Sequence, residues 1–267
     1  MKEFCMKRFI IFVASLSLCS ALIAQSLTGY DVMKRADEKP SPKTTSFTAT
    51  MTLTDRKGQV RIREIIERSK DYGNLSKSVI VFTSPKDVSG VGYLMFDYDE
   101  KSDGTKPDSD RWLYMPAMKK TRRISGSDSG GDFMGTDFTY DDLGERGLSK
   151  DTYTLLGEEN LDGEDCYKVE CKSKDSKEKD QRKICWVTKD NYLMLKAEFY
   201  DRQDMLHRVL TISDYKKKDG YWVSGKMLMK NVQTAHSTLL EMKNTEYDKP
   251  MDDSPFTVAS LENGRIR

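Results

Sequence analysis

The residue that comes nearest to a catalytic group in this chain is Ser127, in the segment Gly126-Ser127-Asp128-Ser129-Gly130. This segment only partly has the outline of the Gly-x-Ser-x-Gly turn that presents the nucleophile of many serine hydrolases. A catalytic triad would also need His207 or His236, the only two histidines of the chain. No helix-rich α/β pattern follows the segment. A lipid-acting hydrolase centred on Ser127 is therefore the weakest functional hypothesis, and it predicts that Ser127→Ala abolishes activity.

Other ligand-binding chemistry finds little support in the same region. The glycine-rich stretch lacks the lysine and the serine or threonine of a phosphate-binding loop. Five nearby aspartates do not have the spacing of a twelve-residue calcium loop, so we interpret them as solvated carboxylates: Asp128, Asp132, Asp137, Asp141 and Asp142. Paired cysteines at zinc-site spacing are also missing. The sequence predicts no metal and no cofactor.

The cysteines leave two interpretations open. Cys5 and Cys19 lie near the N-terminus, and Cys166, Cys171 and Cys185 lie in the remainder of the chain. An odd number of three leaves at least one thiol free. Cys171 and Cys185 would come close if the chain turns back between them, so they could form a disulfide in an oxidising compartment. They could equally remain as inert buried thiols.

The most informative stretch is residues 111–143, RWLYMPAMKKTRRISGSDSGGDFMGTDFTYDDL. Its first strand is apolar on both parities, so one face could pack into a core while the other lines a cavity. A basic strand follows. The next segment combines four glycines with large apolar side chains, which suits a movable lid over an apolar cavity.

This stretch resembles the LolA/LolB-like proteins, and most closely the branch of outer-membrane lipoprotein-sorting-like proteins found with envelope lipid exporters. The resemblance lies in Trp-Leu-Tyr, Met-Pro-Ala, the basic run 119–123, Ser-Gly-Ser-Asp and Phe-Met-Gly-Thr-Asp-Phe, in that order and spacing. Outside the stretch, the likeness is one of strand rhythm along the mature chain. The resemblance implies an incomplete, half-open antiparallel β-barrel with a helical and loop lid over an apolar cavity for acyl chains.

The resemblance also implies roles for particular residues. Four would belong to the cavity wall: Trp112, Tyr114, Met115 and Pro116. Five would close the cavity: Phe133, Met134, Phe138, Tyr140 and Leu143. Arg122 and Arg123 are candidates for contact with a lipid headgroup or a partner, or for holding the lid through Asp137, Asp141 or Asp142. A solvated strand face is the alternative interpretation of the basic run.

The N-terminus predicts export. Basic residues precede the apolar run 9–18, and small residues follow up to Ala24. This pattern is typical of a secretory signal peptide covering residues 1–24. Cys19 provides an alternative, a lipid-modified cysteine that anchors the protein to a membrane. We therefore expect a periplasmic protein.

The rest of the chain predicts one β-rich domain spanning residues 25–267. A helix is expected at 28–38, and about thirteen strand candidates follow, some of which could merge. About eleven strands curled around a few helices would enclose a lipid-sized cavity, whereas an eight-stranded barrel is nearly filled by its own side chains. The net charge of +1 gives no reason to expect nucleic-acid binding.

These observations predict a non-enzymatic periplasmic carrier of lipid or lipoprotein acyl chains. The carrier would load from an inner-membrane exporter and deliver to an outer-membrane acceptor, with peripheral membrane contact as a further expectation. The alternative is a structural or adhesive envelope protein, which predicts a filled core and exposed aromatic side chains at Trp112 or Tyr114. The lipid, the exporter and the oligomeric state stay open.

Overall fold

The computed structural model describes residues 27–264. The predicted signal peptide, with Cys5, Cys19 and Ala24, lies outside the described residues. The predicted helix is present as α1, Gly29–Asp37, and a second helix, α2, spans Val258–Glu262. Within the described residues, no helix combines the length and apolar character needed to cross a membrane.

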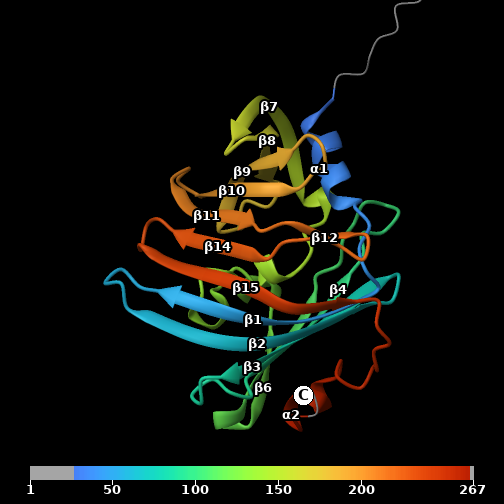
Figure 1. Cartoon of the computed structure of the whole chain (residues 1–267), viewed down its shortest axis with the longest axis vertical. Coiled ribbons are helices and arrows are strands. Elements are labelled where there is room, and N and C mark those ends of the chain that lie inside the picture. Colours follow the sequence, from blue (N-terminus) through green and yellow to red (C-terminus); the bar gives the residue numbers. More distant parts are fainter. Residues whose placement is uncertain (1–26, 265–267) are drawn as a thin grey trace, which may run out of the picture.

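One antiparallel sheet dominates the molecule (Figure 1). Its thirteen strands are β1 Thr44–Thr54, β2 Val60–Asp71, β3 Leu75–Ser84, β4 Gly92–Tyr98, β5 Asp110–Met115, β6 Lys120–Ile124, β7 Asp151–Leu161, β8 Glu164–Ser173, β9 Asp180–Thr188, β10 Met194–Asp201, β11 Leu206–Ser213, β14 Lys226–Asn231 and β15 His236–Tyr247. The short strands β12, Lys216–Lys218, and β13, Tyr221–Val223, form a separate hairpin. The expected count of about eleven strands is therefore too low.

The strand order is β6-β5-β4-β3-β2-β1-β15-β14-β11-β10-β9-β8-β7. Most neighbouring strands are consecutive in the sequence and pair as hairpins. The pairing most distant in sequence is that of β1 with β15, which brings the first and last strands together in the middle of the sheet. Strands β6 and β7 are the two edges and do not pair with each other. The fold is therefore mainly β. Its antiparallel sheet is not closed, which is consistent with a half-barrel.

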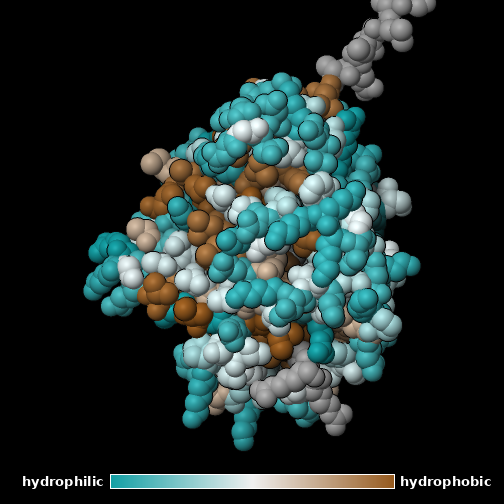
Figure 2. Space-filling view, in the orientation of Figure 1, coloured by the Kyte–Doolittle hydropathy of each residue, from teal (hydrophilic) through white to brown (hydrophobic). Residues whose placement is uncertain are grey.

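Side-chain alternation explains how each strand acquires an inner and an outer face. In β1, Ala49, Met51 and Leu53 are buried on the inner face, and the intervening threonines point to the half-exposed outer face. In the view of Figure 2, the surface of the molecule is largely hydrophilic, with apolar side chains gathered in patches. Exposed large hydrophobic side chains include Val60, Ile62, Met205 and Val232.

The segment between the two edge strands, residues 125–150, returns across the inner face; we call it the lid loop. It contains the 3-10 turns η2 Gly126–Asp128, η3 Phe133–Gly135, η4 Asp141–Leu143 and η5 Leu148–Lys150. A small internal ladder shapes its centre, because the amide of Phe133 donates to the carbonyl of Phe138 at 2.7 Å. Met134 takes a left-handed backbone conformation, with φ of 51°. The predicted lid is thus a compact loop rather than a helix.

Helix α1 starts with a capping box, in which the Thr28 side chain accepts from the amide of Asp31 and the Asp31 carboxylate accepts from the amide of Thr28. The helix packs on β7 and β8. Gly29 lies directly against the β7 backbone, since a Cβ atom there would come within 2.8 Å of the Leu155 nitrogen. The sequence therefore needs glycine at this position for close packing of the helix on the sheet edge.

We expect Gly29→Ala to destabilise the protein by about 1–3 kcal/mol, because the added methyl group meets backbone atoms that cannot rotate away. Thermal unfolding followed by circular dichroism measures the effect. Gly130→Ala is the matched control, since no atom lies within 4 Å of a Cβ at Gly130. Equal melting temperatures for the two variants would contradict the close packing of α1 on β7.

Candidate functional site

The sheet separates the residues that the sequence predicted to share one cavity. Five of them pack on the inner face of the sheet within the same cluster: Met115, Phe133, Met134, Tyr140 and Leu143. Phe138 belongs to a second inner cluster, beneath α1. Trp112 and Tyr114 instead pack on the outer face against Phe256 and Leu261 of the C-terminal segment. Pro116 begins the 3-10 turn η1, Pro116–Met118, at the end of β5.

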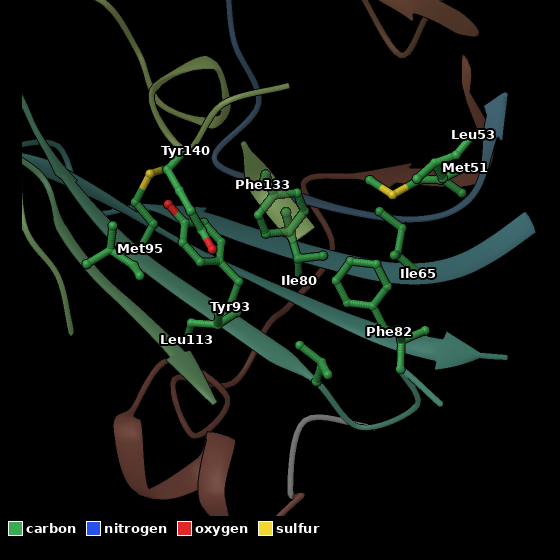
Figure 3. Close-up of a cluster of buried hydrophobic side chains, with 14 residues drawn as sticks. Met51, Leu53, Ile65, Ile80, Phe82, Tyr93, Met95, Leu113, Phe133 and Tyr140 are labelled. Carbon is green, nitrogen blue, oxygen red and sulfur yellow. The ribbon is translucent and has the colours of Figure 1, made fainter. Parts of the chain in front are cut away.

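The lid loop fills one half of the inner face with aromatic side chains (Figure 3). Phe133 is fully buried, and its ring lies 5.3 Å from the ring of Tyr93 and 5.8 Å from that of Phe82. Tyr140 lies 5.6 Å from both Phe133 and Tyr93. These offset and edge contacts are the geometries that aromatic rings prefer. The lid side chains therefore occupy the inner face, where the sequence analysis predicted an apolar cavity.

A buried ionic cluster fastens the lid loop to the other half of the sheet; we call Asp142, Arg208 and Asp180 the latch. Arg208, on β11, has a side chain only 3% exposed. It contacts Asp142 of the lid loop at 2.5 Å and Asp180 of β9 at 2.5 Å, and it donates to the carbonyl of Asp137 at 2.8 Å. Burial raises the pKa of Asp142, but the charge and hydrogen bonds of Arg208 outweigh burial and hold that pKa below its ordinary value.

Two histidines extend this network. His207 contacts Asp180 through Nδ1 at 2.8 Å. His236 contacts Asp137 of the lid loop through Nδ1 at 2.7 Å, and the Thr238 hydroxyl donates to the same Asp137 oxygen at 2.7 Å. Both histidines are thereby paired with carboxylates. Within the described residues, neither one hydrogen-bonds to Ser127, whose hydroxyl instead lies 2.9 Å from that of Ser125.

Further charged contacts hold the lid loop next to the latch and near its C-terminal end. Arg111, on β5, contacts Asp141 at 3.0 Å, and Ser129 donates to the other oxygen of Asp141 at 2.9 Å. Near β7, Arg146 contacts Asp151 at 2.5 Å and Glu178 at 2.9 Å. The loop is therefore clamped by charged contacts along its length.

The arginines that the sequence suggested for holding the lid have other partners. Arg122 is 60% exposed and pairs with Asp128 at 3.0 Å, and Arg123 is 69% exposed and pairs with Asp110. Neither contacts Asp137, Asp141 or Asp142 in the described structure. The prediction that Arg122 or Arg123 holds the lid through these aspartates is wrong, because inner-facing Arg111 and Arg208 do so. Exposure of Arg122 and Arg123 leaves their proposed headgroup contact open.

Two hollows adjoin the lid loop. The first, of about 450 Å³, is polar and lies beside β6, with Arg122, Asp128, Asp132 and Tyr140 among its lining residues. The second, of about 250 Å³, lies between α1, the end of the lid loop and strands β7 to β10. Met33, Tyr153, Met194 and Leu148 give the second hollow an apolar lining. Nothing in the described part of the chain groups three or more potential metal ligands.

Two of the three described cysteines lie in the floor of the second hollow. Cys171 and Cys185 are buried on neighbouring strands, with sulfur atoms 3.9 Å apart, and both are free thiols in this structure. The hydrogen bond with Cys185, together with burial, raises the pKa of the Cys171 thiol. The proposed disulfide between them stays a prediction.

Glu67 is an unusual group on the inner face. It lies on β2 between Phe47 of β1 and Ile80 of β3, and within the described structure it forms no hydrogen bond or ion pair. Its side chain is half-buried, and partial desolvation of the carboxyl group raises its pKa to about 7. A carboxyl group without a partner in apolar surroundings favours its neutral form.

Sequence reasoning missed most of the groups that hold the lid. Arg111, Arg208 and His236 lie at inner-facing strand positions, which is a signal that period-two alternation could have given. Their partners lie far away in the sequence, since Arg208 and Asp142 are separated by 66 residues. Alternation predicts which face a side chain occupies, but not which charged group it meets.

Comparisons with known proteins agree with this architecture. A family model described as that of an uncharacterized protein matches residues 74–263. No curated protein matches the chain. A DUF1329 family protein from Desulfovibrio piger is 33% identical over 87% of this chain and 97% of its own, with a TM-score of 0.81.

Two further solved structures are similar. A domain from Vibrio parahaemolyticus, described as an outer membrane lipoprotein-sorting protein, is 29% identical over 88% of this chain and 98% of its own, with a TM-score of 0.79. A LolA superfamily protein from Nitrosomonas europaea covers 88% of this chain and 99% of its own at 19% identity, and its TM-score of 0.65 shows the shared fold. The chain therefore belongs to the DUF1329 family. It shares its fold with the lipoprotein-sorting domain and with the LolA superfamily protein.

We expect Arg208→Met to loosen the lid loop, because it leaves the Asp142 and Asp180 carboxylates without their main partner. Removing one member of a buried ion pair costs about 3–5 kcal/mol. Hydrogen exchange should accelerate in residues 133–143, as measured by mass spectrometry. Arg123→Met is the control, because an exposed pair contributes about 0–1 kcal/mol. Unchanged lid exchange in a folded Arg208→Met protein would contradict the role of the latch.

We expect Glu67→Gln to stabilise the protein more strongly as the pH rises. The pKa of Glu67 increases from 4.5 to about 7 on folding, so its ionisation destabilises the wild type progressively across that window. Urea unfolding at about pH 5 and about pH 8 measures the change, and the variant's advantage should be larger at the higher pH. Glu246→Gln, at an exposed position of β15, serves as the control. An advantage that does not grow with pH would count against a carboxyl group held neutral by burial.

Proposed function

We propose that this protein is a periplasmic carrier that shields the acyl chains of a lipid or lipoprotein against the inner face of its sheet. The observation that carries the proposal is the lid loop, whose aromatic side chains fill the inner face while charged contacts hold it. In this proposal, the structure is the closed, unloaded form. Cargo takes the place of the lid side chains when the latch opens.

The energies involved are compatible with such an exchange. Exposing Phe133, Phe138 and Tyr140 would cost about 1.5–3 kcal/mol each, and burying a sixteen-carbon chain contributes about 0.8 kcal/mol per methylene, or ~13 kcal/mol before ordering costs. Burial of the acyl chain therefore provides enough free energy to displace the aromatic side chains. Opening the latch takes up part of the remainder, so binding can stay reversible.

Export to the periplasm and transfer from an inner-membrane exporter to an outer-membrane acceptor are parts of the same proposal. The predicted signal peptide and the similar domain from Vibrio parahaemolyticus, described as a lipoprotein-sorting protein, support them. The hairpin ends of the sheet are candidates for peripheral contact with a bilayer or a partner. Ile62 is 56% exposed and Met118 is 53% exposed, with the exposed Lys119 and Lys120 next to Met118. The alternative, an adhesive protein, predicts a filled core and exposed aromatic side chains at Trp112 or Tyr114. The lid side chains do fill the inner face, whereas Trp112 and Tyr114 are partly buried against the C-terminal segment.

The test compares two neighbouring leucines on β15. Leu240 faces the inner cluster, and Leu239 points to the outer face. We expect Leu240→Asp to lose lipid binding and Leu239→Asp to retain it, because only the first places a charge against the acyl chains. Each protein is expressed with its own leader, purified without detergent, and analysed for bound lipid by native mass spectrometry and lipid extraction.

Folding of both variants is checked by circular dichroism, and Met242→Asp on the same inner face provides a second variant. Transfer of a fluorescent phospholipid between donor and acceptor vesicles gives an independent readout, and the wild type should accelerate it. A folded wild type that carries no lipid, takes up none when it is offered and does not accelerate transfer would overturn the proposal.

A further inference from the structure

The hollow beneath α1 has walls of two kinds. Its apolar wall comes from α1, β7 and β10, through Met33, Tyr153 and Met194, and the buried thiols of Cys171 and Cys185 complete the floor. Its charged lining residues are Asp37, Lys39, Arg146, Asp151 and Lys183. The surroundings disfavour charge, since burial lowers the pKa of Lys39. A charge inside such a hollow gains most from a direct partner.

Most of these charges already have partners. Arg146 is paired with Asp151 and Glu178. The Lys39 ammonium donates to the carbonyls of Ala36 at 2.5 Å and Tyr192 at 2.7 Å. Asp37 is exposed to solvent at the end of α1. Water can therefore solvate Asp37, and the inner part of the hollow contains little unsatisfied negative charge.

Lys183 is the exception. It lies on β9 with its side chain on the inner face, opposite Phe199 of β10 and Cys171 of β8. Among the described residues it forms no ion pair and no hydrogen bond. Its ammonium lies 5.5 Å from the centroid of the Phe199 ring, and its charge also acts on Asp142 and on the two buried thiols from beyond ion-pair distance. The residue is half-buried. Its three ammonium donors are thus available to a ligand in the hollow.

We propose that Lys183 binds the anionic head of a single-chain amphiphile, through a carboxylate or phosphate oxygen, with the first part of the chain against Met33, Tyr153 and Met194. The inference rests on the proposed carrier function and adds to it the charge of the cargo. An ammonium group pairs with either anion by charge-assisted hydrogen bonds. An amine head would be repelled, and an uncharged head would leave Lys183 without a partner.

The size of the hollow limits how cargo is placed. Its volume of about 250 Å³ is slightly below the 300–1,000 Å³ typical of small-molecule pockets. The head and the first part of a long chain fit, and the remainder must displace a segment of the lid loop. Arg146 and Leu148 of that loop line the hollow, so a bound head lies next to the end of the segment that would move. Head recognition and lid displacement are therefore neighbouring events in one site.

The experiment compares sixteen-carbon probes that differ in their heads: palmitate, hexadecylamine, hexadecanol and palmitoyl lysophosphatidic acid. Delipidated full-length mature protein is titrated with each, and dissociation constants are measured by calorimetry. We expect palmitate or the lysophosphatidic acid to bind about tenfold more tightly than hexadecanol, and hexadecylamine to bind most weakly. The tighter of the two anions identifies carboxylate or phosphate as the preferred head.

Lys183→Met should weaken binding of the anionic probes and should not weaken binding of hexadecanol, so the preference for an anionic head is lost. Lys183→Arg should retain the preference and shows that the site folds with a charge present. Lys172→Met is the matched control, because Lys172 is an exposed lysine on the outer face of β8 with no ion pair in the described structure. Equal affinity for charged and uncharged heads, or an anion preference that survives in Lys183→Met, would overturn the inference while leaving the carrier function intact. A protein that binds none of the four probes would overturn the inference, and the carrier function with it only if that protein also fails to accelerate phospholipid transfer between vesicles.

Discussion

Arg208 places a positive charge in the interior of the half-barrel. The lid loop has to cross the inner face of the sheet for its Asp142 carboxylate to pair with this charge. Asp142 comes from the loop and Asp180 from β9, so the pairing is complete only when the loop lies across the inner face. A buried pair contributes little net stability, because desolvation offsets most of the attraction, but a missing partner is strongly unfavourable. The latch therefore fixes the position of the loop more than it strengthens the fold.

The lid covers the inner face through apolar packing in one region and through charged hydrogen bonds in another. Around Phe133, the lid fills the inner face with aromatic rings in edge-to-face contact. Such apolar contacts depend only weakly on orientation. Around Arg208, it is held by hydrogen bonds that tolerate little displacement. In the proposed carrier function, an acyl chain replaces the rings because both are apolar, whereas it cannot replace the carboxylates. Under that proposal, the polar contacts are the point at which an exporter or an acceptor would control loading.

Residues 111–143 do not line one common cavity, because they divide between the two faces of the sheet. Alternation along β5 sends Met115 inward and Trp112 outward, and the C-terminal segment covers the outward side with Phe256 and Leu261. A strand that is apolar on both faces signals two covered faces, and the sequence did not specify what covers each. The basic run behaves similarly, because Arg122 and Arg123 find partners nearby at the sheet edge.

The sequence by itself determined the class of fold, the inner and outer parity of strands such as β1, the capped helix at the start and the glycine-rich lid. These features depend on local rules: side-chain period, capping chemistry and glycine backbone freedom. Only the tertiary structure decided that the lid packs inside the half-barrel, that Arg208 rather than Arg122 or Arg123 pairs with Asp142, and that Lys183 lines a hollow without a hydrogen-bond or ion-pair partner. Those outcomes depend on groups such as Asp142 and Arg208, 66 residues apart, being brought together by the strand order. Pairing across the sheet is set by the global arrangement of strands, which no local pattern encodes.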